Sequence, residues 1–90
     1  MKIAYWGSGP ISNFHISALR HLEVDIISCF SRENSSNLLD FSSRHNIQAS
    51  KTEDEFLNRC DDADAVFVAL KTEHTLEALE KLKGNYKVFF

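Results

Sequence analysis

Apolar residues along this chain alternate between short continuous blocks and segments with helical spacing. The blocks Lys2–Trp6 (KIAYW) and Val24–Phe30 (VDIISCF) are rich in β-branched and aromatic residues and predict two strands. Between them, apolar residues recur three and four positions apart, which predicts one face of a helix of about 12 residues. The predicted face consists of Ile11, Phe14, Ala18 and Leu22, with Leu19 beside it. Pro10 fits the first turn of this helix, where its missing N–H costs nothing.

Three more blocks predict strands in the rest of the chain: Ile47–Ser50, Ala65–Leu70 and Tyr86–Phe90. The block Ala65–Leu70 (AVFVAL) is wholly apolar, and Val24–Phe30 is nearly so. Such runs are typical of parallel strands that are covered on both faces.

Three further helices are predicted between these strands. They run from about Leu38 to His45, from Thr52 to Cys60 and from Thr75 to Leu82. Thr52 and Glu55 form a capping-box pattern at the start of the second of these helices. In the third we expect Leu76, Leu79 and Ala78 to face inward. Gly84–Asn85 then ends it.

Strands that alternate with helices predict one α/β domain over residues 1–90, a Rossmann-type, doubly wound parallel sheet with helices on both faces. We expect about five strands in the order 3-2-1-4-5. In such a sheet the order reverses between the first and fourth strands, and ligands bind at the carboxyl ends of the strands there. The segments Gly7–Ser12 and Lys71–His74 follow these two strands.

The turn after the first strand has the glycine spacing of a dinucleotide-binding fingerprint. Gly7 would permit the tight turn, and Gly9 would let the backbone approach a pyrophosphate at the start of the helix. Ser12 takes the third position, which is usually glycine or alanine and must be small. The alternative is a structural turn that binds no ligand.

The end of the second strand bears on which cofactor would bind. The fingerprint usually has an acidic residue there that binds the ribose 2′-hydroxyl. This chain has Ser31 and then Arg32, and an arginine can pair with a 2′-phosphate, which favours NADP over NAD. Because Glu33 is acidic and follows directly, NAD stays an alternative cofactor. The alternative interpretation of Arg32 is a solvated charge in a loop that binds no cofactor.

Composition narrows the class of protein further. The net charge is −3, and acidic and basic residues are interspersed along the chain. The sequence therefore lacks the cluster of basic residues that binding to nucleic acid or to a membrane surface would need. The apolar start of the chain is too short for a signal peptide or a membrane span. Cys29 and Cys60 lack metal or disulfide spacing and predict reduced thiols in a cytoplasmic protein. The four scattered histidines predict no metal site.

Three segments together resemble the N-terminal domain of the Gfo/Idh/MocA family of oxidoreductases, over nearly the whole chain. They are KIAYWGSGPISNFHISAL, IISCFSRE and DADAVFVALKTEHTLEALEKLKGNYKVFF. The most specific features are His15 after the glycine turn, the strand entry Asp64-Ala65-Val66, and His74 at the start of a helix. Lys71-Thr72 stands where family members usually have a Pro-Asn pair.

The resemblance implies hydride transfer between a nicotinamide cofactor, NADP or NAD, and a sugar-like alcohol or carbonyl substrate. In that family a Glu-Lys-Pro motif with a catalytic lysine follows the fifth strand, and a substrate domain comes after it. Neither is in these 90 residues, so we assign no catalytic residue and expect the chain alone to be inactive. The alternative is a non-catalytic nucleotide-binding or interaction module on the same fold.

The expected cofactor contacts come from three segments. They are Gly7, Ser8, Gly9, Pro10 and Ile11, largely through the backbone, then Ser31 and Arg32, and then Leu70, Lys71, Thr72 and His74. The alternative to a cofactor contact for His74 is a structural hydrogen bond at the start of the helix. For Lys71 we favour the interpretation as a solvated lysine at the end of a strand. For His15 we favour a position in the core or at the edge of the pocket over a catalytic role.

The last predicted strand is also an expected contact surface. Its apolar side chains are Tyr86, Val88, Phe89 and Phe90. An uncovered apolar sheet edge invites pairing between chains, so we expect a homo-oligomer that forms through this end.

Overall fold

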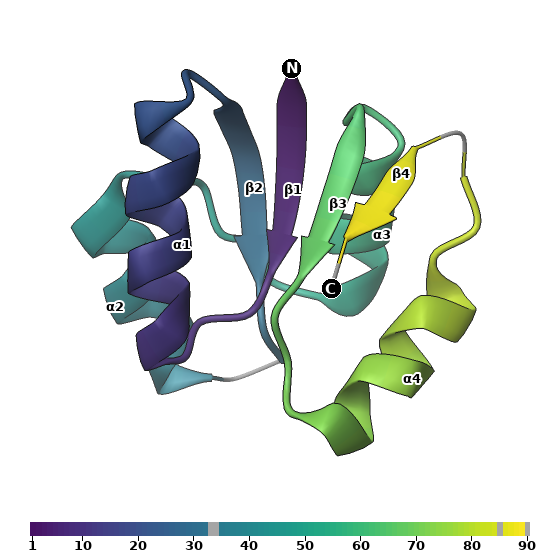
Figure 1. Ribbon diagram of the computed structural model, residues 1–90. Coiled ribbons are helices and arrows are strands. Elements are labelled where there is room, and N and C mark those ends of the chain that lie inside the picture. Colours follow the sequence, from purple (N-terminus) through teal and green to yellow (C-terminus); the bar gives the residue numbers. More distant parts are fainter. Residues whose placement is uncertain (33–34, 85, 90) are drawn as a thin grey trace.

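The computed structural model describes residues 1–32, 35–84 and 86–89, so the predictions that involve Glu33, Asn85 and Phe90 lie outside the described residues. Four parallel strands form one sheet in the order β2-β1-β3-β4 (Figure 1). The strands are β1 (Lys2–Trp6), β2 (Asp25–Phe30), β3 (Ala65–Val68) and β4 (Lys87–Phe89). The helices are α1 (Pro10–His21), α2 (Ser36–His45), α3 (Glu53–Cys60) and α4 (Thr72–Lys81). The parallel α/β architecture is therefore confirmed.

Neighbouring residues of β1 show that helices cover both faces of the sheet. Tyr5 packs its ring against Phe41 of α2 and hydrogen-bonds His15 of α1. Trp6, the next residue, points to the opposite face and packs against Phe56 of α3. Figure 1 shows α1 and α3 on opposite sides of the sheet, as expected for a doubly wound fold.

The third predicted strand, Ile47–Ser50, is wrong as a strand. This segment makes a single parallel bridge, between Cys29 and Ala49, on the outer side of β2. It is short because Asn46 ends α2 in the left-handed conformation and Thr52 already caps α3. The sheet therefore has four strands, and the predicted order 3-2-1-4-5 becomes β2-β1-β3-β4 with a bridged segment at the first position.

The predicted inner face of α1 is also wrong. Ile11, Phe14, Ala18 and Leu22 are exposed, and Leu19 alone of the predicted set packs partly buried against the core, whereas Ser12 and Ile16 are fully buried. The rotation of α1 is set by the glycine turn, because Ser12 must lie beneath that turn. A longer side chain would not fit there, and the spacing of apolar residues alone carries no information about this constraint.

Helix α4 shows a similar difference. It begins at Thr72, three residues before the predicted start, so His74 lies within its first turn. Ala78 is its buried residue and Leu79 is partly buried, but Leu76 is exposed. Because an alanine faces the sheet, α4 leaves room beside Trp6, which bears on the site described below. No helix within the described ranges combines the length and apolar character that a membrane crossing requires.

Candidate functional site

Gly7 ends β1 in a conformation that other residues rarely adopt. Its φ is +151°, and its N–H donates to the carbonyl of Phe30 at 2.6 Å. A Cβ at this position would lie 2.6 Å from the carbonyl oxygen of Ala69. The absence of a side chain at Gly7 thus lets the end of β1 lie close to the end of β2 and to the segment after β3, where no Cβ would fit.

Gly9 serves a different purpose. A Cβ added to Gly9 would meet no atom within 4 Å, so the space above this residue is open. Gly9 is the N-cap of α1, Pro10 follows it, and no acidic residue lies in the first turn. The positive dipole end of α1, which no side chain caps, therefore faces an open space that suits an anion.

Ser12 lies beneath this turn. Its side chain is fully buried, and its hydroxyl oxygen finds no hydrogen-bond partner within the described part of the chain. A Cβ at Gly7 would come within 3.2 Å of that oxygen. The position therefore requires a small side chain, as the fingerprint does, and it leaves one buried polar atom unsatisfied next to the turn.

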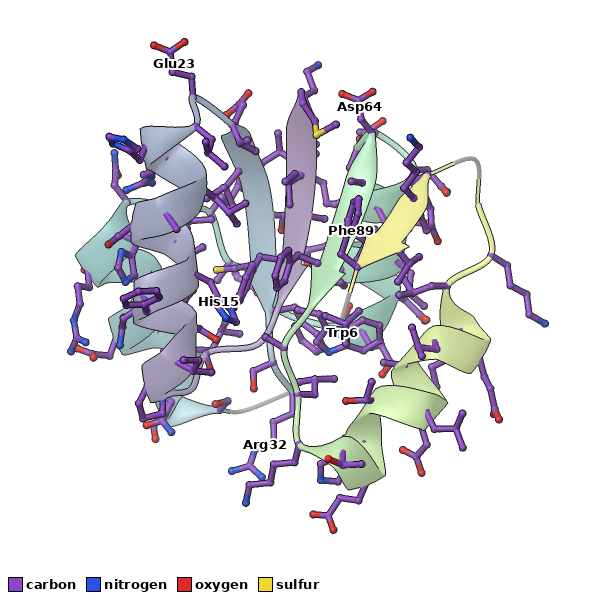
Figure 2. All side chains as sticks on the ribbon, viewed as in Figure 1. Trp6, His15, Glu23, Arg32, Asp64 and Phe89 are labelled. Atoms are coloured by element: carbon purple, nitrogen blue, oxygen red, sulfur yellow. The ribbon has the colours of Figure 1, made fainter. Side chains whose placement is uncertain are left out.

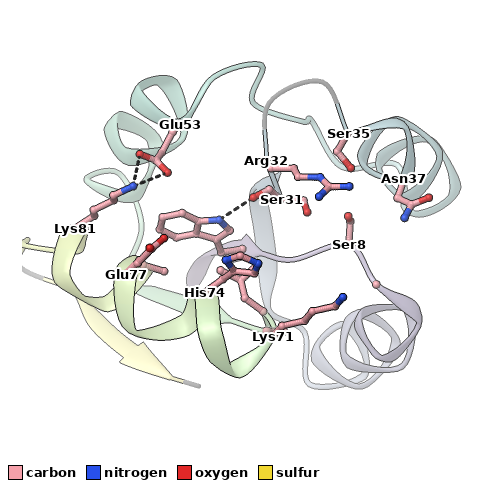
Figure 3. A pocket seen from close by; sticks show the side chains of 15 residues that line it. Ser8, Ser31, Arg32, Ser35, Asn37, Glu53, Lys71, His74, Glu77 and Lys81 are labelled. Carbon is pink, nitrogen blue, oxygen red and sulfur yellow. Dashed lines mark hydrogen bonds and ion pairs between the residues drawn. The ribbon is translucent and has the colours of Figure 1, made fainter.

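A cleft of about 440 Å³ opens at the carboxyl ends of the strands, where the strand order reverses (Figure 3). Its lining comes from the end of β1 and the turn after it, the loop after β2 and the start of α2, the segment after β3, and the helices α3 and α4. These residues are Trp6, Ser8, Gly9, Ser31, Arg32, Ser35, Asn37, Glu53, Ala69, Leu70, Lys71, His74, Glu77, Ala78 and Lys81. Figure 2 shows Trp6 and Arg32 at this end of the sheet and Glu23 and Asp64 at the other.

Most of the residues proposed from the sequence lie around this cleft. Its lining includes Ser8, Gly9, Ser31, Arg32, Leu70, Lys71 and His74. Gly7 is buried beneath the turn, and Pro10 borders a smaller neighbouring hollow between α1 and α2. Ile11 and Thr72 are exposed and line neither cavity.

Sequence reasoning missed several lining residues: Trp6, Ser35, Asn37, Glu53, Ala69, Glu77, Ala78 and Lys81. A signal existed for Trp6, since it ends β1 directly before the glycine turn. Its indole Nε1 donates to the carbonyl of Ser31 at 3.1 Å and so holds the loop after β2 in place. Glu53 and Lys81 come from helices far apart in the sequence, and only the folded chain brings them together.

The charged side chains divide the cleft into two ends. Figure 3 shows Arg32 and Lys71 turned toward Ser8, with Glu53, Glu77 and Lys81 grouped at the opposite end. Lys81 Nζ lies 3.0 and 3.2 Å from the two carboxylate oxygens of Glu53. This hydrogen bond raises the pKa of Lys81.

His15 packs inside the domain, next to the sheet. Its Nδ1 lies 2.7 Å from the hydroxyl of Tyr5, and its ring packs 5.1 Å from that of Phe67. Burial raises the pKa of Tyr5 to about 12, so its hydroxyl stays protonated at neutral pH. This geometry agrees with a core position for His15.

The two thiols are both buried. Burial raises the pKa of Cys29 and of Cys60 to about 12, so neither forms a thiolate at neutral pH. Within residues 1–32, 35–84 and 86–89, no group of three or more metal-binding side chains comes together.

Neither a protein-family model nor a curated protein sequence matches this chain. Solved structures do. The chain is similar to a protein assigned as an NADPH-dependent oxidoreductase from Desulfitobacterium hafniense, with a TM-score of 0.78 and 21% identity over 90% of this chain and 23% of that one. It is also similar to the WlbA dehydrogenase of Chromobacterium violaceum in complex with NADH and UDP-GlcNAcA, with a TM-score of 0.74 and 21% identity over 98% and 26% of the two chains.

A third similar structure is the PH0520 protein of Pyrococcus horikoshii. Its TM-score is 0.63, with 22% identity over 97% of this chain and 25% of that one. The chain thus spans about a quarter of the length of each of these proteins. At such identities the likeness establishes a shared fold, which is Rossmann-like with a four-stranded sheet.

Proposed function

We propose that this chain is the nicotinamide-dinucleotide-binding domain of an oxidoreductase of the Gfo/Idh/MocA type. The observation that carries the proposal is the glycine turn at the strand-order reversal, with the cleft open above Gly9. Two of the similar structures support it, since one is assigned as NADPH-dependent and the other contains NADH.

The residues present fit a dinucleotide. The pyrophosphate would lie over Gly9 and the first turn of α1, where no side chain caps the start of the helix. The adenosine ribose would lie beside Ser31 and Arg32, and the nicotinamide half beside the segment Leu70–His74. The bound cofactor would supply the hydride chemistry, and this chain would orient it.

We favour NADP over NAD as the cofactor. Arg32 is exposed at the cleft, and no ion pair occupies it among the described residues. Ser35, the N-cap of α2, is buried at the edge of the cleft, and its hydroxyl does not cap the helix. No acidic residue lies in the first turn of α2, so a 2′-phosphate would meet a cation, a hydroxyl and a helix N-terminus.

A calorimetric titration of the chain with NADP and with NAD tests this proposal. NADP should bind more tightly, and Arg32→Ala should weaken NADP binding about tenfold or more while changing NAD binding little. Arg59→Ala is the matched control, because it removes the same charge at a residue that bonds Ile27 and Asp62 away from the cleft. Absence of binding by both cofactors would contradict the proposal.

For the complete protein we propose hydride transfer to or from a sugar-like alcohol or carbonyl. The similar WlbA dehydrogenase, which is in complex with NADH and UDP-GlcNAcA, supports this proposal. The family resemblance assigns the catalytic lysine and the substrate domain to segments beyond these 90 residues, so the chain alone should show no turnover. Dehydrogenase activity from the pure chain would contradict that assignment.

We also propose that the chain self-associates through β4. This strand forms the edge of the sheet, and Phe89 on it is 46% exposed. An edge strand with unpaired backbone groups and an exposed aromatic side chain favours strand pairing with a second copy. Sedimentation at rising concentration should show a dimer, and a constant monomer would contradict this proposal.

A further inference from the structure

Two consecutive residues at the end of β1 hold two consecutive carbonyl groups at the end of β2. The N–H of Gly7 donates to the carbonyl of Phe30 at 2.6 Å. The indole Nε1 of Trp6 donates to the carbonyl of Ser31 at 3.1 Å (Figure 3). Among the residues that the structure describes, this is the one hydrogen bond to the backbone of Ser31 or Arg32. The position of that backbone therefore depends on a side chain.

The indole that donates this bond is itself fixed by packing. Trp6 is 3% exposed, and its ring centre lies 5.3 Å from that of Phe56 on α3 and 6.3 Å from that of Phe30 on β2. Contacts from two elements leave a buried side chain few rotamers. Because so little of Trp6 reaches the cleft, we expect it to affect a ligand through Ser31 and not by touching the ligand.

The hydrogen bond reaches Arg32 through a single peptide group. The carbonyl of Ser31 and the N–H of Arg32 belong to one planar unit, so a donor that holds the oxygen also holds the nitrogen at which Arg32 begins. The Arg32 side chain is exposed and forms no ion pair within the described part of the chain. A long side chain loses conformational entropy when it pairs with a ligand, and a fixed backbone reduces that loss.

We propose that Trp6 is a positioning residue for the choice of cofactor: its indole N–H holds the peptide between Ser31 and Arg32 and so places the guanidinium for a 2′-phosphate. The inference rests on the proposed function, in which Arg32 binds the phosphate that distinguishes NADP from NAD. Bonds between a guanidinium and a phosphate are directional, so a displaced Arg32 backbone weakens them. NAD lacks this phosphate, and its binding therefore depends much less on Trp6.

Calorimetric titration of Trp6→Phe with NADP and with NAD tests this inference. Phenylalanine keeps an aromatic ring but cannot donate, so NADP affinity should fall about fivefold, the scale of one neutral hydrogen bond, while NAD affinity changes little. In an Arg32→Ala background the same change should hardly affect NADP binding further, because the guanidinium that Trp6 positions is gone. Phe56→Leu is the matched control, since it loosens the packing around Trp6 without removing a hydrogen bond, and it should keep the wild-type ratio of the two affinities.

A second substitution removes the donor and keeps the packing. Trp6 is the only tryptophan of the chain, so expression in a tryptophan auxotroph fed with 3-benzothienylalanine replaces this indole alone by a ring of similar shape, with sulfur in place of the N–H. This protein should show the same selective loss of NADP affinity. An unchanged ratio of the two affinities in both proteins, or an effect that adds to that of Arg32→Ala, would overturn the inference and leave the proposed function standing. Binding of neither nucleotide to the wild type would overturn both.

Discussion

The hydroxyl groups of Ser28 and Ser50 form a buried hydrogen bond of 2.8 Å between β2 and the segment that follows α2. The backbone supports the same contact, because the N–H of Ser50 donates to the carbonyl of Cys29 at 2.9 Å. Ser50 lies in Ile47–Ser50, the segment that the sequence predicts as the third strand. A local polar contact thus holds the edge of the sheet in place of an extended ladder.

Loss of one hydroxyl should destabilise this edge. Ser28→Ala leaves the Ser50 hydroxyl buried without its partner, which costs about 1–3 kcal/mol of unfolding free energy. Ser28→Ala/Ser50→Ala should cost less than the sum of the two single changes, because neither hydroxyl is then left unpaired. Urea unfolding of the four proteins measures this coupling. Additive effects would show that the two hydroxyls do not depend on each other.

The two glycines of the turn should respond differently to substitution. Gly7→Ala should destabilise the fold by about 1–3 kcal/mol, since its φ is +151° and the new Cβ would meet the Ala69 carbonyl at 2.6 Å. Gly9→Ser should keep the stability, because the space is open and serine is a favoured N-cap. It should nevertheless weaken NADP binding, since its side chain occupies the space above the turn.

Thermal unfolding and NADP titration of both glycine variants separate these two roles. Gly7→Ala should unfold at a lower midpoint temperature, and Gly9→Ser should bind NADP with lower affinity at an unchanged midpoint. If Gly9→Ser bound NADP as tightly as the wild type, the phosphates would have to lie elsewhere.

The N-cap of α3 is a third testable feature. Thr52 accepts a hydrogen bond from the N–H of Glu55 at 3.1 Å, as the capping-box pattern predicts. Thr52→Ala should cost about 1 kcal/mol, which lowers the melting temperature of a domain of this size by roughly 4–8 °C. Ser43→Ala is the control, as Ser43 is exposed within α2 and caps no helix. Calorimetry should show no comparable loss for that control.

His45 makes the contact between α1 and α2 sensitive to pH. Its Nε2 lies 2.6 Å from Asn13 Oδ1, which can only accept, so the ring donates. Burial, and then the charges of Arg20 and Arg44, lower the pKa of His45 from 6.5. The unfolded chain therefore binds this proton at higher pH than the folded chain does. The stability from His45 is complete above about pH 6.5 and is lost as the pH falls through the lowered pKa.

Urea unfolding between pH 7.5 and pH 5 checks this direction by comparing the wild type with His45→Gln. The glutamine amide can still donate to Asn13 but does not titrate, so this variant should lose less stability on acidification. Identical losses in the two proteins would show that other groups cause the acid sensitivity.

The sequence predicts the layout of this domain well where the signal is local. The glycine turn, the capping box at Thr52 and the apolar block of β3 each depend on a few neighbouring residues. The inner face of α1 was predicted wrongly, because its rotation depends on Ser12 beneath Gly7 and not on the apolar spacing. The predicted strand Ile47–Ser50 failed for a related reason, as Asn46 and Thr52 end the neighbouring helices too close to it.

The residues of the candidate site likewise divide into those that the sequence predicts and those that only the folded chain brings together. Ser31 and Arg32 could be proposed because strand ends at the order reversal are recognisable in the sequence. Glu53, Glu77 and Lys81 could not, since nothing local relates the start of α3 to the far half of α4. Their meeting depends on how both helices pack around Trp6.

The most direct test of the account maps NADP onto the chain by nuclear magnetic resonance. On titration with NADP, amide signals of a ¹⁵N-labelled chain should shift for residues that line or flank the cleft. These are Ser8, Gly9, Ser31, Arg32, the segment Leu70–His74, and Glu77. Signals at the opposite end of the sheet, around Glu23 and Asp64, should stay in place. Shifts confined to that opposite end, or no shifts at millimolar NADP, would contradict the assignment of this cleft as a nucleotide site.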